Sequence, residues 1–351
     1  MLDTNKFVKE LENSGYTHLC VVPCSFAKNL INSCINNPNI EYIASASEAV
    51  AISIASGLKL SGAKPIVIVQ SSGLTNMGSA ITSMLKPYNI TLPIITSWRT
   101  YKEGDSEVQH KHLATKLPNL IEAYGYNHDI LDQDSISKAI SQIENANETQ
   151  TIIVLQKDTF SKVELEDSYK IDLSNYPKRS EYLKVLNEKY KNSEAIFIGT
   201  TGNTAREMYS FMPQTKNFYM VGNMGGALSL GVGMAKAGKK VFVLGGDAEF
   251  VMHMGGVATA GRYKELDLTY ILFDNHSNKS TGGQATFQEH LDYIGVAKSC
   301  GMNVADEAIV SVGRFKDTLE SLGKLNFVYT KCDYDEVTPR PPVEVVTINR
   351  I

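Results

Sequence analysis

The chain has little excess charge and no long apolar run. Its 351 residues include 34 Lys and Arg against 38 Asp and Glu, a formal net charge of -4 at pH 7. A chain with this small negative net charge is not expected to carry the broad positive surface that binds nucleic acids or membranes. No stretch approaches the roughly 18–20 apolar residues that a membrane-spanning helix needs. The first fifteen residues lack the cationic start and apolar centre of a signal peptide, so we expect a cytoplasmic protein.

Cysteine is also scarce. The five cysteines are odd in number and share no metal-site spacing, because Cys20 and Cys24 enclose three residues rather than two. Reduced, mostly buried thiols are therefore expected in preference to a disulfide framework or a redox centre.

The residues that are present describe a globular protein of two domains. Hydrophobic residues make up 43% and charged residues 21% of the chain. Short apolar runs alternate with loops and helical patterns in both halves, which predicts parallel sheets covered by helices on both faces. The predicted strands are 18–22, 41–44, 65–70, 92–97 and 151–155 in the first half, and 195–198, 241–244, 268–273 and 327–331 in the second. We therefore expect an α/β fold with two doubly wound parallel-sheet domains.

A polar, charged segment from about 161 to 179 interrupts this alternation. It has little hydrophobic periodicity and is typical of an interdomain linker. We expect a first domain over residues 1–160, a linker over 161–180 and a second domain over 181–351.

Polar side chains follow two predicted strands of the second half. The run 241–244 ends in Gly245-Gly246-Asp247, and the run 268–273 ends in Asp274-Asn275. If these runs are neighbouring parallel strands, Asp247 and Asn275 lie at the same carboxyl edge, where open α/β sheets bind ligands. Hard oxygen ligands there suit Mg²⁺ together with an anchored phosphate. The alternative is an ordinary strand-to-loop turn, because Gly-Gly-Asp recurs widely.

This pattern resembles the signature of thiamine-diphosphate enzymes, Gly-Asp-Gly followed about 25 residues later by Asn-Asn. Here the motif is Gly246-Asp247-Ala248, then 25 residues, then Asp274-Asn275. The resemblance implies that Asp247, the Asn275 side chain and the Ser277 carbonyl hold Mg²⁺, which grips the diphosphate of the cofactor. It also implies that the first domain binds the pyrimidine ring and the second the diphosphate.

Glu48 stands where a predicted strand meets an alanine-rich helix. Taken alone, it is a first-turn carboxylate that the helix dipole favours. The resemblance implies a catalytic role instead, in which this glutamate hydrogen-bonds the pyrimidine ring of the cofactor and assists proton exchange.

Glycine-rich turns supply further candidates for cofactor binding. The turn 221–226 could serve close packing alone, but the resemblance implies that the Gly222 carbonyl accepts from the pyrimidine and that Met224 supports the bent cofactor. Thr200, Thr201 and Gly202 offer hydroxyls and amides to the diphosphate. The complete candidate set for the cofactor is Thr200, Thr201, Gly202, Gly222, Met224, Gly246, Asp247, Ala248, Glu249, Asn275 and Ser277.

Within the thiamine-diphosphate enzymes, a series of short motifs resembles those of the phosphonopyruvate decarboxylases and the related sulfopyruvate decarboxylases. It covers about residues 5–330. It departs from the family at Thr100 of Trp98-Arg99-Thr100, where glycine is usual, at Gly226, where histidine is usual, and at Ala248, which replaces the glycine of the metal motif. The motifs are Val22-Pro23-Cys24-Ser25, Trp98-Arg99, Gln109-His110, Thr200-Thr201-Gly202-x-Thr204-x-Arg206-Glu207, Met252-His253-Met254-Gly255 and Ser280-Thr281-Gly282-Gly283-Gln284.

The implied reaction is decarboxylation of 3-phosphonopyruvate to phosphonoacetaldehyde and CO₂. Sulfopyruvate decarboxylation, another 2-oxo acid decarboxylation or carboligation to an aldehyde would use the same residues. A catalytically silent nucleotide-binding module is the alternative from a different class. The presence of Glu48, Asp247 and Asn275 argues against a catalytically inactive protein.

Recognition of a phosphonate or sulfonate needs two or three charge-assisted donors. Each candidate donor could equally be a solvated surface group, and His253, after an apolar run, is expected in the core. The candidate donors are Ser25, Arg99, His110, Lys111 and Lys279.

The resemblance also implies an oligomer. Glu48 belongs to the first domain and Asp247 to the second, and the family pairs these domains across chains. We expect a homodimer or a dimer of dimers with active sites at the subunit interface, a small anionic 2-oxo acid as substrate, and neither nucleic acid nor membrane as partner.

Overall fold

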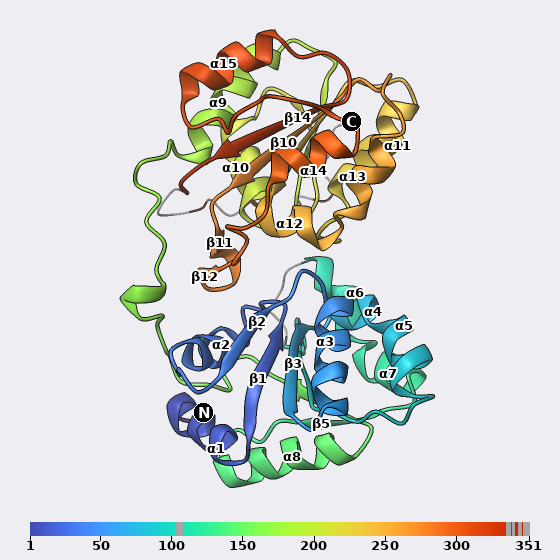
Figure 1. Cartoon of the computed structure of the whole chain (residues 1–351), viewed down its shortest axis with the longest axis vertical. Coiled ribbons are helices and arrows are strands. Elements are labelled where there is room, and N and C mark those ends of the chain that lie inside the picture. Colours follow the sequence, from blue (N-terminus) through green and yellow to red (C-terminus); the bar gives the residue numbers. More distant parts are fainter. Residues whose placement is uncertain (103–107, 335–337, 339–340, 343–345, 347–351) are drawn as a thin grey trace. The chain divides into compact units, whose positions relative to one another are not determined.

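The computed structural model describes residues 1–102, 108–334, 338, 341–342 and 346. The chain divides into two compact units (Figure 1). Unit 1 comprises Met1–Lys170 and Asn278–Gln284, and unit 2 comprises Ile171–Ser277 and Ala285–Ile351. The division after Lys170 falls inside the segment predicted as a linker, whereas residues 278–284 were placed by the sequence in the second domain.

Unit 1 is built on a six-stranded sheet in the order β2-β1-β3-β4-β6-β5. Every neighbouring pair is parallel. The strands are β1 (Tyr16–Val21), β2 (Glu41–Ala44), β3 (Lys64–Gln70), β4 (Ile94–Ser97), β5 (Asn127–Ile130) and β6 (Thr151–Leu155).

Helices cover both faces of this sheet, as β1 demonstrates. Leu19 and Val21 belong to one hydrophobic core, and Cys20 between them belongs to another, because successive side chains of a strand point to opposite faces. The helices are α1 (Thr4–Asn13), α2 (Lys28–Ile35), α3 (Glu48–Leu60), α4 (Gly73–Asn76), α5 (Gly78–Ala80), a π-helical turn (Ile81–Leu85), α6 (Lys111–Ala114), α7 (Leu117–Ala123) and α8 (Ile136–Glu148).

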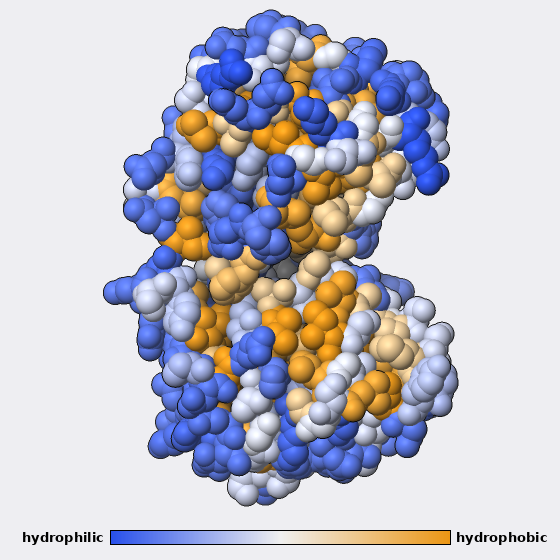
Figure 2. All heavy atoms as spheres, viewed as in Figure 1, coloured by the Kyte–Doolittle hydropathy of each residue, from blue (hydrophilic) through white to orange (hydrophobic). Residues whose placement is uncertain are grey.

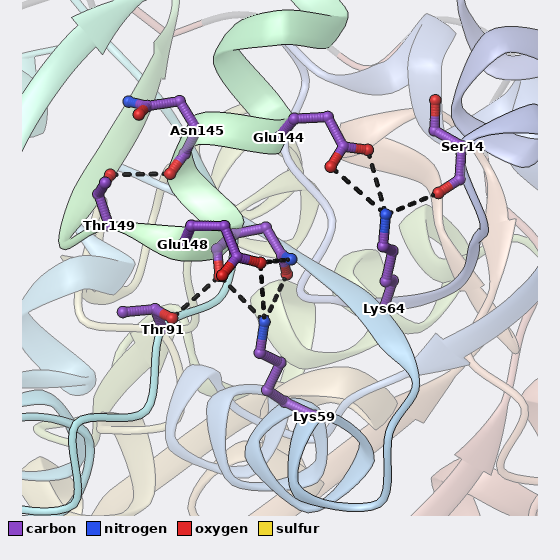
Figure 3. A network of polar contacts seen from close by, with 9 residues as sticks. Ser14, Lys59, Lys64, Thr91, Glu144, Asn145, Glu148 and Thr149 are labelled. Atoms are coloured by element: carbon purple, nitrogen blue, oxygen red, sulfur yellow. Dashed lines mark hydrogen bonds and ion pairs between the residues drawn. The ribbon is translucent and has the colours of Figure 1, made fainter.

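Two lysines tie the end of α8 to neighbouring elements (Figure 3). Lys59, in the last turn of α3, donates to the backbone carbonyl of Asn147 at 3.0 Å and to its side-chain oxygen at 2.9 Å. Lys64, at the start of β3, donates to Glu144 at 3.3 Å and to the Ser14 carbonyl at 3.1 Å. Cations satisfy carbonyls that a helix leaves open at its C-terminus. The Lys59 contacts fix the far end of α3, whose first residue is Glu48.

Unit 2 repeats the design with a second six-stranded parallel sheet, in the order β13-β14-β10-β9-β7-β8. Its strands are β7 (Ile196–Gly199), β8 (Lys216–Tyr219), β9 (Val241–Gly246), β10 (Leu268–Asp274), β13 (Asn303–Val304) and β14 (Asn326–Lys331), with a separate two-stranded sheet of β11 (Ser277–Asn278) and β12 (Gln284–Ala285).

Two hydrophobic cores flank this sheet as well. A buried ion pair joins the first two helices of the unit, since Arg179 donates to both carboxylate oxygens of Glu207 at 2.8 Å. The helices are α9 (Arg179–Tyr190), α10 (Asn203–Phe211), α11 (Ala227–Lys236), α12 (Asp247–Met252), α13 (Gly255–Ala260), α14 (Tyr293–Ser299) and α15 (Val312–Glu320).

The predicted α/β class with two parallel sheets is confirmed. Within the part of the chain that the structure describes, no helix has both the length and the apolar character needed to cross a membrane.

Candidate active site

The two strand ends of the Gly-Asp motif are neighbours, as the sequence predicted. β9 and β10 pair in parallel, with Gly246 opposite Phe273. Asp247 and the Asp274-Asn275 pair therefore emerge at one edge of the sheet. Asp247 is buried, and its Oδ2 accepts a hydrogen bond of 3.0 Å from the Thr286 hydroxyl.

A second buried carboxylate, Asp274, lies beside Asp247. Its Oδ1 accepts from the His276 amide at 2.9 Å and its Oδ2 from the Tyr329 hydroxyl at 2.6 Å. Burial, together with the charge of Asp274, raises the pKa of Asp247 well above its usual range. A divalent cation would relieve this unfavourable pairing of negative charge. The sequence treated Asp274 only as a replaced asparagine, although its place directly after a strand marked it as a residue of the same edge.

The remaining metal candidates follow β10 at once. The Asn275 side-chain oxygen accepts from the Ser277 amide at 3.2 Å, and both residues are buried. The carboxylate of Asp247, the amide oxygen of Asn275 and the carbonyl of Ser277 are hard oxygen donors, the class that Mg²⁺ takes in proteins. The donor set present at this edge therefore fits the metal.

The turn after β7 has the features of an anion site. Gly202 has a φ of 92°, a left-handed conformation that favours glycine, and α10 begins at the next residue without a side-chain cap. The buried Thr200 hydroxyl has no hydrogen-bond partner among the described residues. The Thr201 hydroxyl, in contrast, donates to the Val221 carbonyl at 2.8 Å. An unsatisfied hydroxyl beside open helix amides fits a diphosphate.

The turn that carries Met224 explains one departure from the family pattern. Asn223 and Gly225 have positive φ values of 56° and 89°. A Cβ on Gly226 would lie 2.3 Å from the Asn223 side-chain nitrogen, so a histidine does not fit there unless Asn223 moves. His253 packs against Gly225 but is exposed. The expectation of a core histidine at 253 is wrong, because the apolar α12 ends at Met252 and His253 follows the helix.

Glu249 connects two of these turns from inside the unit. It is buried and accepts a 2.6 Å hydrogen bond from the Tyr270 hydroxyl. Burial raises the pKa of Glu249 to about 7, although that hydroxyl and the amides of Ala227 and Gly246 favour its charged form. Glu249 thus links the turn of Asp247 to the first residue of α11. Gly245 has no room for a side chain, since a Cβ would lie 2.3 Å from the Tyr270 ring.

In unit 1, Glu48 is buried at the first turn of α3, which Ser47 caps. Two residues of α4 surround its carboxylate. Asn76 donates to Oε2 at 2.8 Å, and Gly73 approaches so closely that a Cβ there would lie 2.5 Å from Oε1. No local sequence pattern indicated either contact. Together they hold the carboxylate in one direction.

The predicted substrate donors separate into two groups. Arg99 is only 8% exposed; one of its terminal nitrogens donates to the Ser25 hydroxyl, and its guanidinium lies 4.2 Å from the centre of the Phe26 ring. His110 is also buried, so the surface interpretation is wrong for these two residues. The other three candidates, Ser25, Lys111 and Lys279, are exposed.

Comparisons with known proteins identify the family. The profile of the thiamine pyrophosphate enzyme N-terminal TPP-binding domain matches residues 4–118, and that of the C-terminal TPP-binding domain matches residues 198–325. The chain belongs to the thiamine-diphosphate-dependent enzymes. Their cofactor is thus the cofactor of this protein.

Relatives resemble the chain over most of its length. Phosphonopyruvate decarboxylase of Streptomyces viridochromogenes is 28% identical over 338 residues, which cover 91% of this chain and 85% of the relative. Phosphonopyruvate decarboxylase of Streptomyces hygroscopicus is 28% identical over 86% of this chain and 80% of its own length. Sulfopyruvate decarboxylase of Methanosarcina acetivorans is 25% identical over 92% of this chain and 89% of its own length. The expected enzyme class, a thiamine-diphosphate-dependent decarboxylase, is confirmed.

Proposed function

We propose that this enzyme catalyses the Mg²⁺-dependent, non-oxidative decarboxylation of 3-phosphonopyruvate to phosphonoacetaldehyde and CO₂. The observation that carries the proposal is the similarity to phosphonopyruvate decarboxylase along 91% of the chain. Sulfopyruvate decarboxylation is the second candidate, since a sulfopyruvate decarboxylase matches 92% of the chain at a somewhat lower identity of 25%.

In this proposal the edge of the second sheet binds the cofactor. Asp247, Asn275 and the Ser277 carbonyl hold Mg²⁺, while the Thr200 hydroxyl and the amides at the start of α10 receive the diphosphate. Bound thiamine diphosphate supplies the nucleophilic carbon and the electron sink for the loss of CO₂.

Glu48 is the proposed catalytic residue. Its carboxylate hydrogen-bonds the pyrimidine ring and moves a proton there, and its fixed direction between Asn76 and Gly73 serves this task. An acid that is already oriented needs no rearrangement when the cofactor binds.

The phosphonate of the substrate requires donors in unit 1. Arg99 is held by the Ser25 hydroxyl and the Phe26 ring, so its planar guanidinium presents a fixed charge to an anion. A buried guanidinium binds a phosphonate through charge-assisted hydrogen bonds.

We further propose that the enzyme acts as a homodimer or a dimer of dimers with active sites between subunits. Glu48 lies in unit 1 and Asp247 in unit 2. On α3, Val50 is 40% and Ile54 is 38% exposed, and these side chains lie one turn apart on the same helix face. Figure 2 shows hydrophobic side chains gathered over α3. This face is suited to covering by a second copy of the chain.

Release of CO₂ from phosphonopyruvate, sulfopyruvate and pyruvate, with the aldehyde product identified by NMR, tests the function. We expect turnover to require thiamine diphosphate and Mg²⁺, with the highest kcat/KM for phosphonopyruvate. Arg99→Met should raise KM for phosphonopyruvate about 10- to 100-fold, and the matched variant Arg99→Lys should recover part of that loss. A higher kcat/KM for sulfopyruvate would replace the first proposal by the second, and accumulation of a ligated product instead of the aldehyde would contradict both.

A further inference from the structure

The turn at the end of β4 contains a residue in an unfavourable backbone conformation. Thr100 has a φ of 60°, in the left-handed region that β-branched residues rarely adopt. Such strain persists only where surrounding contacts impose it, and it concentrates at functional sites. A glycine would adopt the same φ freely.

Two hydroxyl groups of this turn are buried without a partner. The Ser97 Oγ and the Thr100 Oγ1 make no hydrogen bond to any described residue. Buried hydroxyls are nearly always hydrogen-bonded, because an unsatisfied one loses its hydrogen bonds to water without replacement. Thr100 itself is half-buried, so the residue is partly accessible from solvent although its hydroxyl is not.

The surroundings of the turn identify the kind of ligand. Two hydrogen bonds of Trp98 hold the turn in place. The Trp98 amide donates to the Leu155 carbonyl at 2.8 Å, and its indole N–H donates to the Ala114 carbonyl at 2.8 Å. Arg99, between the two hydroxyls in sequence, is held against Ser25. The turn also lies at the carboxyl edge of the sheet, where α/β folds bind ligands. Two unpartnered hydroxyls on either side of an arginine in sequence offer several donors to an oxyanion with several acceptor oxygens.

We propose that Thr100, assisted by Ser97, is a specificity residue of this enzyme and donates its hydroxyl to the anionic group at C3 of the substrate. This inference rests on the proposed function and extends it, because it assigns the strained position to substrate selection. The energetic cost of the left-handed threonine is retained because glycine, the relaxed alternative, has no hydroxyl to donate.

The chain contains a single tryptophan, Trp98, directly beside this turn. Its fluorescence therefore reports ligand binding without turnover. Phosphonoacetate, sulfoacetate and acetate serve as probes for the wild type and for the variants Thr100→Val, Thr100→Ser, Thr100→Gly and Ser97→Ala. Thermal unfolding of the same proteins measures the backbone strain, and phosphonopyruvate kinetics give KM and kcat.

We expect phosphonoacetate, but not acetate, to change the fluorescence of the wild type. Thr100→Val and Thr100→Gly should weaken phosphonoacetate binding and raise KM about tenfold with little change in kcat, and Thr100→Ser should restore both. Ser97→Ala should weaken binding less. Thr100→Gly should also raise Tm, since the strain is relieved.

Wild-type affinity and KM in Thr100→Val and Thr100→Gly would overturn the inference and leave Thr100 as a strained loop residue without a ligand. Equal responses to acetate and phosphonoacetate would also overturn it. A wild type that binds phosphonoacetate through Thr100 yet does not decarboxylate phosphonopyruvate would contradict the proposed function while supporting the anion site.

Discussion

At the scale of single residues, the surroundings of Glu48 give the sharpest test of its role. Glu48→Gln keeps the shape of the side chain but removes the acid, so the variant should fold and bind thiamine diphosphate normally. Its kcat should fall by about 100-fold or more, the range typical of a lost general acid or base. Steady-state decarboxylation beside cofactor titration measures both quantities. Turnover at the wild-type rate would return Glu48 to the role of a helix-start carboxylate.

Gly73→Ala tests the direction of the same carboxylate without altering it chemically. The new Cβ would lie 2.5 Å from Oε1 of Glu48, so the carboxylate must turn away. We expect kcat to fall at least tenfold while the fold remains, because one flexible side chain can yield at modest cost. Gly313→Ala, in the exposed first turn of α15 where a Cβ meets nothing, is the matched control and should keep full activity. Equal activity in the two variants would contradict this account.

Asp247 is the residue on which metal binding depends most. Asp247→Ala removes a ligand and its charge together, so thiamine diphosphate should no longer be retained in the presence of Mg²⁺. Calorimetric titration with and without the metal measures this loss. Thr286→Val, which removes only the hydroxyl bound to Asp247, serves as the control and should weaken binding far less. Near-normal affinity in Asp247→Ala would disprove the metal assignment.

At the scale of elements, the Arg179–Glu207 pair fixes α9 against α10. Both side chains are almost completely buried, so removal of one leaves the other charge unpaired. Arg179→Met should lower the free energy of unfolding by about 3–5 kcal/mol, whereas the double variant Arg179→Met with Glu207→Leu should recover much of it. Urea denaturation followed by circular dichroism measures the three proteins. Equal stability of the single and double variants would show that the pair is not coupled.

Three strands of the two six-stranded sheets were not predicted from sequence patterns, and all three lie at sheet edges. They are β5, β8 and β13, and each is the last strand at one end of its sheet. A strand at an edge has a neighbour on one side only and often carries polar residues. The sequences Asn-His-Asp-Ile of β5 and Lys-Asn-Phe-Tyr of β8 therefore lack the apolar run that revealed the central strands.

At the scale of the whole molecule, the proposed dimer predicts complementation between two inactive variants. If each site takes Glu48 from one subunit and Asp247 from the other, a mixed dimer of Glu48→Gln and Asp247→Ala contains one intact site of two. An equal mixture whose subunits exchange at random should recover about a quarter of the wild-type sites. Activity after co-refolding, with sedimentation to establish the oligomer, measures this. An active monomer, or no recovery despite proven exchange, would exclude sites between subunits.

The sequence by itself determined the fold class, the central strands and the residues of the cofactor edge. Apolar runs that end in glycine and carboxylate are local patterns, and a parallel sheet brings the ends of such runs to one edge. The sequence alone therefore predicted that Asp247 and Asn275 lie at the same edge, and the parallel pairing of β9 and β10 confirms it.

Only the tertiary structure decided how these residues are held. The contacts of Asp274 with Tyr329, of Glu48 with Asn76 and Gly73, and of Glu249 with Tyr270 join residues that are 55, 28, 25 and 21 positions apart, respectively. No local pattern encodes such pairings, because they depend on which strands and helices pack together. The left-handed φ of Thr100 is likewise imposed on a residue whose own preference is extended, by packing around its turn.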